Sequence, residues 1–460
     1  MQRLTAIDAS FLFSEDGRSH NDIGMVLQFD GPAMTRADVM SAIAGRLALV
    51  PRFRQRIRQV PMAAALPVWV DDTRFDIARH VFESAAPAGG DPLGAAVSRV
   101  MSDQLDHDLP LWQAHVITGL ADDGWALVVR MHHAMVDGVS STEIVRVLLS
   151  DSTEPAPTVP DDWRPAPEPT GPELVAAAMA DAARDTAQAF GAMVGAQPPS
   201  LGTGPPPDLR PLMVPGLPIP DAALNGPIQA ARCWGMTDVP LATLKRISKS
   251  IGGTVKDVLM TAAAHAFTEL LRSRGEPVDE RVLRAMVPVS LRAGGSGGPD
   301  NAVAGGNEVG AMLVQLPLGD SSPAARLQRI REQTAAFKAL KDVMPANQIA
   351  PGPGLTSPLM VILGTRMAAL APAAANTVVT NVPGPQQPLY FDGRRLRRLG
   401  ACIALWAPLR IAVSIMSYDG TAYVGVVTDR SSIPEVAPVL AAFTAGIEEL
   451  AVQTRERKPN

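Results

Sequence analysis

Two adjacent histidines, His132 and His133, open the part of this sequence where chemistry is easiest to place. Asp137 and Gly138 follow in the same run, HHAMVDG. A histidine side chain, with an ordinary pKa of about 6.5, can accept a proton from an alcohol or a thiol at neutral pH. The pair therefore predicts general-base chemistry, with the aspartate holding the turn that follows it rather than relaying protons.

The segments around the pair predict a strand, a turn and a helix. The apolar run 125–131 is typical of a buried strand, along which side chains alternate. If this strand continues through the pair, the two rings point to opposite faces. One ring then faces a reaction centre while the other packs or orients the turn, and we assign the base to His133. Residues 140–143 (SSTE) have a capping-box pattern that predicts a helix over 141–150.

Three other interpretations of the pair remain open on the residues alone. Adjacent histidines can be core residues without a function. They can bind a metal, although neighbouring strand side chains diverge and no H-x-x-x-H or cluster of Cys and Glu accompanies them. His132 to Asp137 also resembles the H-x-x-x-x-D signature of glycerolipid phosphate acyltransferases, whose membrane-embedded helices this sequence lacks. We predict no metal and no redox cofactor.

The composition indicates a globular protein that does not bind nucleic acid. Apolar residues make up 47% of the 460-residue chain, charged residues 19%, and the net charge is −5. Two cysteines cannot build a disulfide framework, which favours a reducing compartment. The N-terminus lacks a signal-peptide pattern, and no run of about 18 apolar residues predicts a membrane span. We therefore expect a cytoplasmic protein.

Proline-rich stretches divide the chain into two halves. We predict an N-terminal domain over 1–195, which includes a proline-rich connector from about 151 and a helix over 173–194. A proline-rich linker over 196–225 leads to a C-terminal domain over 226–460. Because both halves mix strand and helix patterns, the fold class is α/β (α+β).

The C-terminal half contains the clearest local patterns. Asp419-Gly420 lies between two strand-like runs and predicts a hairpin over 409–429. Helical periodicity predicts helices over 241–252, 255–275 and 436–456.

The run HHAMVDG matches the HHxxxDG motif of the acyl-CoA-dependent acyltransferase superfamily, which includes chloramphenicol acetyltransferases and peptide-synthetase condensation domains. Other stretches resemble, in order along nearly the whole chain, the bacterial wax ester synthase/diacylglycerol acyltransferase family, and in particular its actinobacterial triacylglycerol synthases. These stretches are MQRLTAIDASFLF, PRFRQRI, PVWVDDTRFDIARHV, LDHDLPLW, PVSLR, GGNEVGAMLVQLPL, TNVPGPQQPLY and SYDGTAYVGVVTDR.

The resemblance implies two chloramphenicol-acetyltransferase-like domains, each a mixed sheet flanked by helices, with an active-site tunnel at their interface. It implies His133 as the base and acyl-CoA as a co-substrate, with no other cofactor. It implies diacylglycerol as the acceptor, giving triacylglycerol, and also long-chain alcohols, giving wax esters. We expect peripheral association with the inner face of the plasma membrane or with lipid droplets, where these lipids lie. The alternatives are another hydroxyl acceptor, or a catalytically impaired paralogue that binds acyl lipids.

Two groups of residues in the N-terminal half have both a functional and a structural interpretation. Pro110, Leu111 and Trp112 resemble the family's PLW motif, which either lines a substrate channel or anchors the core, and we favour the core. Arginines alternate along residues 52–58, which predicts four guanidinium groups on one face of a strand. They can meet the phosphates of coenzyme A or form a solvated face, and we favour the solvated face.

Residues of the C-terminal half are expected to complete the substrate site. Ser290 and Arg292 follow a short apolar strand, and Arg292 can pair with Asp137 across the interface or meet a phosphate. Asn381 precedes the rigid turn Pro-Gly-Pro, which the family match predicts to line the tunnel.

One position departs from the family pattern. The family usually has an Asn-Asp pair in the stretch that reads TVKDVLMT here, so that Asp257 is retained and Lys256 replaces the asparagine. If the pair positions substrate, activity or acceptor choice is altered in this protein. If the pair only caps a helix, position 256 simply lies at its start.

Overall fold

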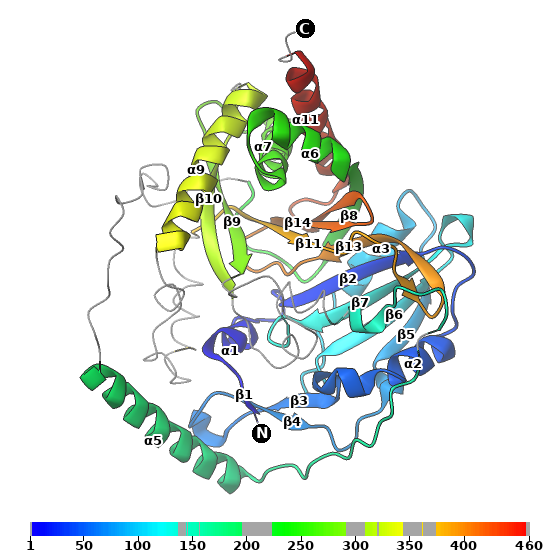
Figure 1. The fold of residues 1–460 in the computed structure, drawn as a ribbon, viewed down its shortest axis with the longest axis vertical. Coiled ribbons are helices and arrows are strands. Elements are labelled where there is room, and N and C mark those ends of the chain that lie inside the picture. Colours follow the sequence, from blue (N-terminus) through cyan, green and yellow to red (C-terminus); the bar gives the residue numbers. More distant parts are fainter. Residues whose placement is uncertain are drawn as a thin grey trace.

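Within the described residues, two six-stranded sheets and one three-stranded sheet form the framework of the protein (Figure 1). The computed structural model describes residues 2–136, 144, 146–155, 157–195, 223–290, 309–319, 322–343, 361 and 374–456. The first sheet has the order β12 (Tyr390–Phe391), β13 (Arg394–Cys402), β2 (Asp22–Phe29), β7 (Trp125–His132), β6 (Trp112–Thr118) and β5 (Val81–Ala85). The second has the order β10 (Val309–Pro317), β9 (Val282–Ser290), β11 (Thr377–Pro383), β14 (Ile411–Tyr418), β15 (Thr421–Asp429) and β8 (Arg232–Pro240).

Helices cover the sheets. The helices α6 (Leu241–Ile251), α7 (Val255–Ser273), α9 (Pro323–Val343) and α11 (Ala437–Glu456) gather on one face of the second sheet (Figure 1). The helices α1 (Ala6–Phe13), α2 (Arg36–Ala44) and α3 (Pro92–Val100) belong to the N-terminal half, and α3 packs against both β6 and β8. Each half therefore has a mixed sheet flanked by helices, and the predicted α/β class is confirmed.

Three apolar clusters make up most of the interior. One lies between the second sheet and its helices, and one lies within the first sheet around Trp112 and Trp125. A third joins the halves, because Val26 and Val128 of the first sheet meet Trp234 of the second through α3. The two halves thus share a core, which fixes their relative position.

The clearest local patterns are confirmed. The buried run that starts at Trp125 is β7, and the helices expected over 241–252, 255–275 and 436–456 are α6, α7 and α11. The predicted hairpin is β14 and β15, and it turns at Asp419 and Gly420, where φ is 43° and 79°. Positive φ at both turn residues is what a two-residue hairpin of type I′ requires.

Strand β13 joins sequence-distant parts of the chain. It pairs antiparallel with β2, so a segment from the C-terminal half extends the sheet of the N-terminal half. The first sheet is therefore built from both ends of the chain. The predicted domain boundaries, 1–195 and 226–460, remain a prediction.

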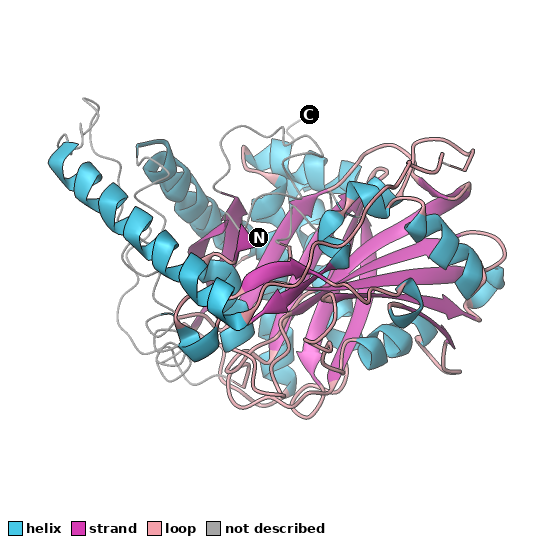
Figure 2. Ribbon diagram, turned by 90° about the horizontal axis from the view of Figure 1, so that it is seen from below, coloured by secondary structure: helices cyan, strands magenta, loops and turns pink. Residues whose placement is uncertain are grey.

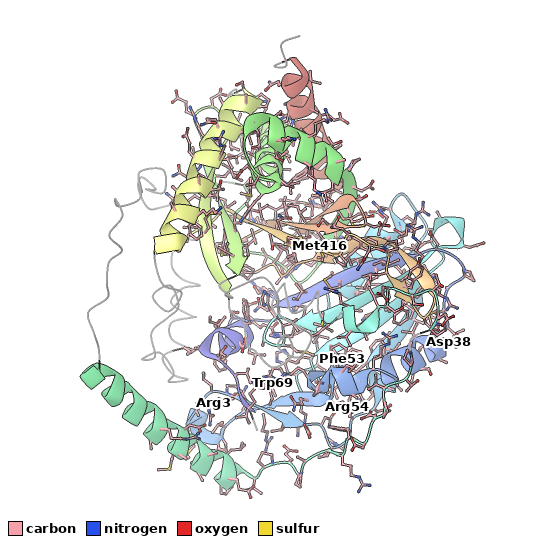
Figure 3. The ribbon with its side chains drawn as sticks, viewed as in Figure 1. Arg3, Asp38, Phe53, Arg54, Trp69 and Met416 are labelled. Atoms are coloured by element: carbon pink, nitrogen blue, oxygen red, sulfur yellow. The ribbon has the colours of Figure 1, made fainter. Side chains whose placement is uncertain are left out.

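Three of the four arginines of residues 52–58 contact the proline-rich connector. Contrary to the expectation of one continuous strand, Pro51–Arg54 form a short 3₁₀ turn and only β3 (Gln55–Arg58) is extended. Arg54 forms an ion pair with Asp161 and lies over the ring of Trp163, 4.7 Å from its centroid (Arg54 is labelled in Figure 3). The solvated face that we favoured is therefore wrong for Arg54, which is buried against the connector, whereas the side chain of Arg58 is 46% exposed.

Two more arginines of this series are engaged in the same region. Arg56 lies 2.6 Å from Glu168 of the connector. Arg52 is buried with its guanidinium 4.3 Å from the ring centroid of Trp69, on β4 (Val68–Asp71), and burial lowers its pKa to about 10 (Trp69 is labelled in Figure 3). The guanidinium groups of Arg52 and Arg56, which were candidates for binding coenzyme A, thus contact other residues of the protein.

The helix predicted over 173–194 is α5 (Gly171–Gly195), and it reaches away from the body of the molecule (Figures 1 and 2). Its first turns pack on the three-stranded sheet of β1 (Gln2–Arg3), β4 and β3, where Leu174 and Ala178 are buried against Val68. No helix in the described parts of the chain combines the length and the apolarity that a bilayer crossing needs.

Candidate active site

The histidine pair lies where the central strand β7 ends. All eight residues of β7 are buried, and the strand lies between β2 and β6. The strand stops at His132 and a turn begins at His133, so the expected continuation through the pair is wrong by one residue. The backbone N–H of His132 donates to the carbonyl of Leu111, and the carbonyl of His132 accepts from Met135 N. Asp137 and Gly138 lie outside the described residues.

His132 is completely buried, and both of its ring nitrogens face protein groups. Its Nδ1 accepts a hydrogen bond from Ala134 N at 3.0 Å. A neutral ring that accepts at Nδ1 carries its proton on Nε2. This Nε2 lies 3.2 Å from Oε1 of Glu15, within ion-pair distance although off the line of an ideal hydrogen bond. Neither nitrogen of His132 is therefore placed to accept a proton from a substrate.

Glu15 collects four partners in the interior. Its Oε1 also accepts from Asn21 N at 2.7 Å. Its Oε2 accepts from Gln104 Nε2 at 3.0 Å and lies 3.0 Å from Nε2 of His107. Burial by itself raises the pKa of this carboxyl, but the contacts from His107, His132 and Asn21 prevail and hold the pKa well below its usual range. Glu15 is therefore a charged carboxylate with 3% of its side chain exposed.

The side chains of Glu15, His107 and His132 lie close enough together to be considered as metal ligands. A metal-bound histidine uses one nitrogen for the metal and normally donates a proton from the other. In His132 the nitrogen remote from Glu15 is an acceptor, so a metal at Nε2 would leave the ring with no proton at all. The geometry favours a proton between His132 and Glu15 over a metal ion.

His133 has a different environment. Its backbone N–H donates to the carbonyl of Asn21 at 2.7 Å, and its ring stacks on that of Phe11, with centroids 4.0 Å apart and planes 12° apart. The side chain of Asn21 in turn donates to the carbonyl of Phe11 at 2.6 Å. Residue His133 is half-buried, although its ring Nδ1 is itself a buried atom, whereas His132 is completely buried. Of the two rings, His133 is the less buried, and its role as the base remains a prediction.

Behind the pair, a buried ion pair fixes the two central strands to each other. Arg130, on the same face of β7 as His132, donates to Oδ2 of Asp22 at 2.6 Å and 3.1 Å. Arg130 also donates to the carbonyl of Asp103. The loop that carries Asp103 continues to Gln104 and His107, so Arg130 and Glu15 hold the same loop at two points.

Pro110, Leu111 and Trp112 lie at the start of β6 and are all buried. The indole N–H of Trp112 donates to the carbonyl of Phe53 at 2.8 Å, and the indole ring stacks on Phe53 and His80 (Phe53 is labelled in Figure 3). These are core contacts, while Leu111 touches the site through its hydrogen bond from His132. Whether the motif also lines a substrate channel remains a prediction.

Asp257 lies at the start of α7 in a capping box. Its Oδ2 accepts from the backbone N–H and the hydroxyl of Thr254 at 2.7 Å and 2.8 Å. Its Oδ1 accepts from the hydroxyl of Thr334 on α9 at 2.7 Å. Lys256 is half-buried in the first turn of α7. The described contacts of Asp257 are those of a helix cap and a brace between two helices.

The remaining predicted residues lie on the second sheet. Ser290 is the last residue of β9 and pairs through its backbone with Val309, and Asn381 is half-buried near the end of β11. Because β9 and β11 are parallel, their C-terminal ends lie at the same edge. Arg292 is outside the described residues, so its pairing with Asp137 remains a prediction.

Comparisons with solved structures define the class of fold. A wax ester synthase/diacylglycerol acyltransferase from Marinobacter aquaeolei VT8 matches with a TM-score of 0.68 over 99% of this chain and 100% of that chain, at 23% identity. The first condensation domain of the CDA synthetase matches with a TM-score of 0.59 over 100% of this chain and 97% of that chain, at 15% identity. The protein has the two-domain fold that these acyltransferases and condensation domains share.

Sequence comparisons then define the family. The model of the wax ester synthase/diacylglycerol acyltransferase catalytic domain matches residues 4–259, and the model of the C-terminal domain of the same family matches residues 305–451. A Mycobacterium tuberculosis protein described as a probable diacylglycerol O-acyltransferase is 30% identical over 100% of this chain and 97% of its own length. The chain belongs to the wax ester synthase/diacylglycerol acyltransferase family, which confirms the resemblance found in the sequence.

Proposed function

We propose that this protein transfers a long-chain acyl group from acyl-CoA to the hydroxyl of diacylglycerol, making triacylglycerol, and to long-chain alcohols, making wax esters. Family membership supports this substrate pair. The observation that supports a direct mechanism is the contrast within the histidine pair. Both nitrogens of His132 face protein groups, whereas His133 is half-buried at a turn.

In this mechanism His133 is the general base. It takes the proton of the acceptor hydroxyl while the oxygen attacks the carbonyl carbon of the thioester, and a new C–O bond forms. Collapse of the tetrahedral intermediate breaks the C–S bond, and the proton on His133 passes to the sulfur of coenzyme A. The products are an ester and free coenzyme A, with no covalent acyl-enzyme and no cofactor.

The substrates meet between the two halves in this proposal. We propose that Asp137 and Gly138 hold the turn after the pair, and that Ser290 and Asn381, near the C-terminal ends of β9 and β11, supply the opposite wall together with Arg292. In Figure 1 the arrowhead of β9 points toward the region of α1, whose Phe11 stacks on His133. The acyl chain is bound mainly by burial, at about 0.8 kcal/mol per methylene.

Association with a membrane or lipid-droplet surface is the second part of the proposal. Diacylglycerol resides in such surfaces, and two large apolar side chains are exposed near the base of α5. Met62 is 86% exposed in the turn Pro61–Ala63, which contacts α5, and Met179 of α5 is 70% exposed. Replacing both methionines with serine is expected to reduce sedimentation of the protein with phospholipid vesicles that contain diacylglycerol. Unchanged sedimentation would remove these residues from the proposal.

The catalytic proposal is tested with labelled acyl-CoA and a panel of diacylglycerols, long-chain alcohols and other hydroxyl acceptors. The His133→Ala variant is expected to lose about 10²–10⁴-fold in kcat, the range of general-base catalysis, without loss of thermal stability. His265→Gln, on α7, is the matched control and is expected to turn over normally. Full turnover by His133→Ala would refute the mechanism. Binding of acyl-CoA without turnover of any acceptor by the native protein would favour the impaired acyl-lipid-binding paralogue instead.

A further inference from the structure

Glu15 lies in a segment for which the proposed chemistry has so far given no role. It follows α1 directly, and its carboxylate is buried where α1, β7 and the loop after α3 come together. Burial of a carboxylate is unfavourable unless hydrogen bonds and opposite charges compensate for the lost water. Four partners within 3.2 Å provide that compensation here.

The two oxygens of Glu15 hold different parts of the structure. Oε1 receives Asn21 N at 2.7 Å and faces Nε2 of His132 at 3.2 Å. Oε2 receives Gln104 and faces His107, both from the loop after α3. The rings of His107 and His132 meet edge to face, with centroids 5.6 Å apart. The carboxylate thus joins the loop to the end of the strand that carries the histidine pair.

Both members of the histidine pair depend on this arrangement. The backbone N–H of Asn21 donates to Glu15, and the backbone C=O of Asn21 accepts from the N–H of His133. One residue therefore links the carboxylate to the proposed base. Phe11, about one helical turn before Glu15, stacks on the ring of His133. Movement of the segment after α1 therefore moves the partners of His133.

We propose that Glu15 is a positioning residue for acyl transfer: with His107 it holds His132 in the Nε2–H tautomer, and through Asn21 it sets the orientation and the electrostatic environment of His133. This inference rests on the proposed function, because it assumes that His133 is the base. His107 is the exposed member of the unit, with 39% of its side chain accessible. Contact with Glu15 raises the pKa of His107, so the protonated form of His107 is favoured and its positive charge then offsets the carboxylate.

The charged groups around His107 and His132 define what pH can change. They are Glu15 from the end of α1, Asp106 from the loop after α3, and the Arg130–Asp22 pair from β7 and β2. The charges of Arg130 and Asp22 offset each other, because Arg130 is hydrogen-bonded to Asp22. Of these groups Glu15 is the one that lies within ion-pair distance of His132, and its charge is offset when His107 is protonated.

The Glu15→Gln variant tests the inference, because it keeps the shape and removes the charge. We expect kcat to fall about ten- to hundred-fold with the KM for acyl-CoA unchanged, as for a displaced catalytic group. We also expect the acidic limb of the pH profile of kcat/KM to move to lower pH, because a lost carboxylate no longer stabilises a nearby imidazolium. A variant that is only partly folded would lower the rate without moving the limb.

The His107→Asn variant gives the opposite shift and does not depend on the folding of the first variant. Without the positive charge of His107, Glu15 acts more strongly, so the acidic limb is expected to move to higher pH. Glu449→Gln is the matched control, since Glu449 faces His265 at 3.5 Å on the surface of the helical layer. It is expected to leave rate and profile unchanged.

The outcomes separate the inference from the proposed function. If His133→Ala abolishes turnover while Glu15→Gln and His107→Asn keep the native rate and profile, the positioning role is refuted and the base remains. If His133→Ala is fully active, the proposed function fails first. Opposite shifts in the two variants, with NMR titration showing a lower pKa for His107 in Glu15→Gln, would establish the inference.

Discussion

Replacing Asp257 with alanine distinguishes a structural role of this residue from a role in substrate binding. In the family pattern Asp257 belongs to an Asn-Asp pair that can position substrate. Its described contacts instead cap the start of α7 and join it to α9. It is only 1% exposed, and both oxygens are used by Thr254 and Thr334. We expect the Asp257→Ala variant to be less stable than the native protein and to bind acyl-CoA with an unchanged KM.

The size of the effect follows from the bonds that are lost. Removal of a helix N-cap interaction costs about 0.5–2 kcal/mol. A hydrogen bond to a charged group contributes about 1.5–3 kcal/mol, but Thr334 keeps a second contact, since its hydroxyl lies 3.0 Å from the carbonyl of Arg331. The expected total is therefore about 2–4 kcal/mol. Asp257→Asn, which keeps one acceptor oxygen, should lose roughly half of this.

Urea unfolding and steady-state kinetics together measure the two sides of this prediction. The unfolding midpoint of Asp257→Ala should fall, with the asparagine variant in between, while KM and kcat per folded molecule stay at the native level. Thr334→Val, which removes only the brace to α9, is the control and should reproduce the smaller part of the loss. A variant of native stability with a raised KM would refute this reasoning and assign Asp257 to the substrate site.

Two further predictions concern the core and the pH dependence of stability. Trp112→Phe should lower stability by about 1–3 kcal/mol, because the carbonyl of Phe53 loses a buried donor; unchanged thermal unfolding would contradict the assigned hydrogen bond. The low pKa of Glu15 implies stability that is complete above its ordinary value of 4.5 and is lost as pH falls below it. The raised pKa of His107 implies stability that is complete below its ordinary value of 6.5 and is lost as pH rises through the raised value. Melting temperatures measured across this range should decline less steeply on the alkaline side in His107→Asn than in the native protein.

Local patterns in the sequence were sufficient to predict several of the elements. Strand β7 is a continuous apolar run, α6 and α7 have helical periodicity, and Asp419-Gly420 favours the positive φ angles of a tight hairpin turn. Each of these signals lies within a few residues, where chain geometry alone limits the choices. The histidine motif was found for the same reason, since its members are consecutive.

Long-range partners could not be predicted in this way. The pairing of β13 with β2 joins residues more than 360 positions apart, for example Leu399 with Leu27. Likewise no spacing rule connects Glu15 with His107 and His132, which only the fold brings together. The arginines of residues 52–58 were visible, but their partner, the connector near Asp161, was not. The sequence shows which residues are charged, but only the folded structure shows which groups compensate their charges.

The question raised by the adjacent histidines has a geometric answer. At the end of a strand, consecutive side chains leave in different directions, so two neighbouring rings face different surroundings. Here the inward ring accepts from Ala134 N and faces Glu15, which leaves it no free lone pair for catalysis. The next ring sits on the turn, where its backbone is tied to Asn21 and its face to Phe11. If, as proposed, the first histidine anchors the strand end and the second is the base, both residues are needed, and moving the base one position along the chain is predicted to abolish catalysis.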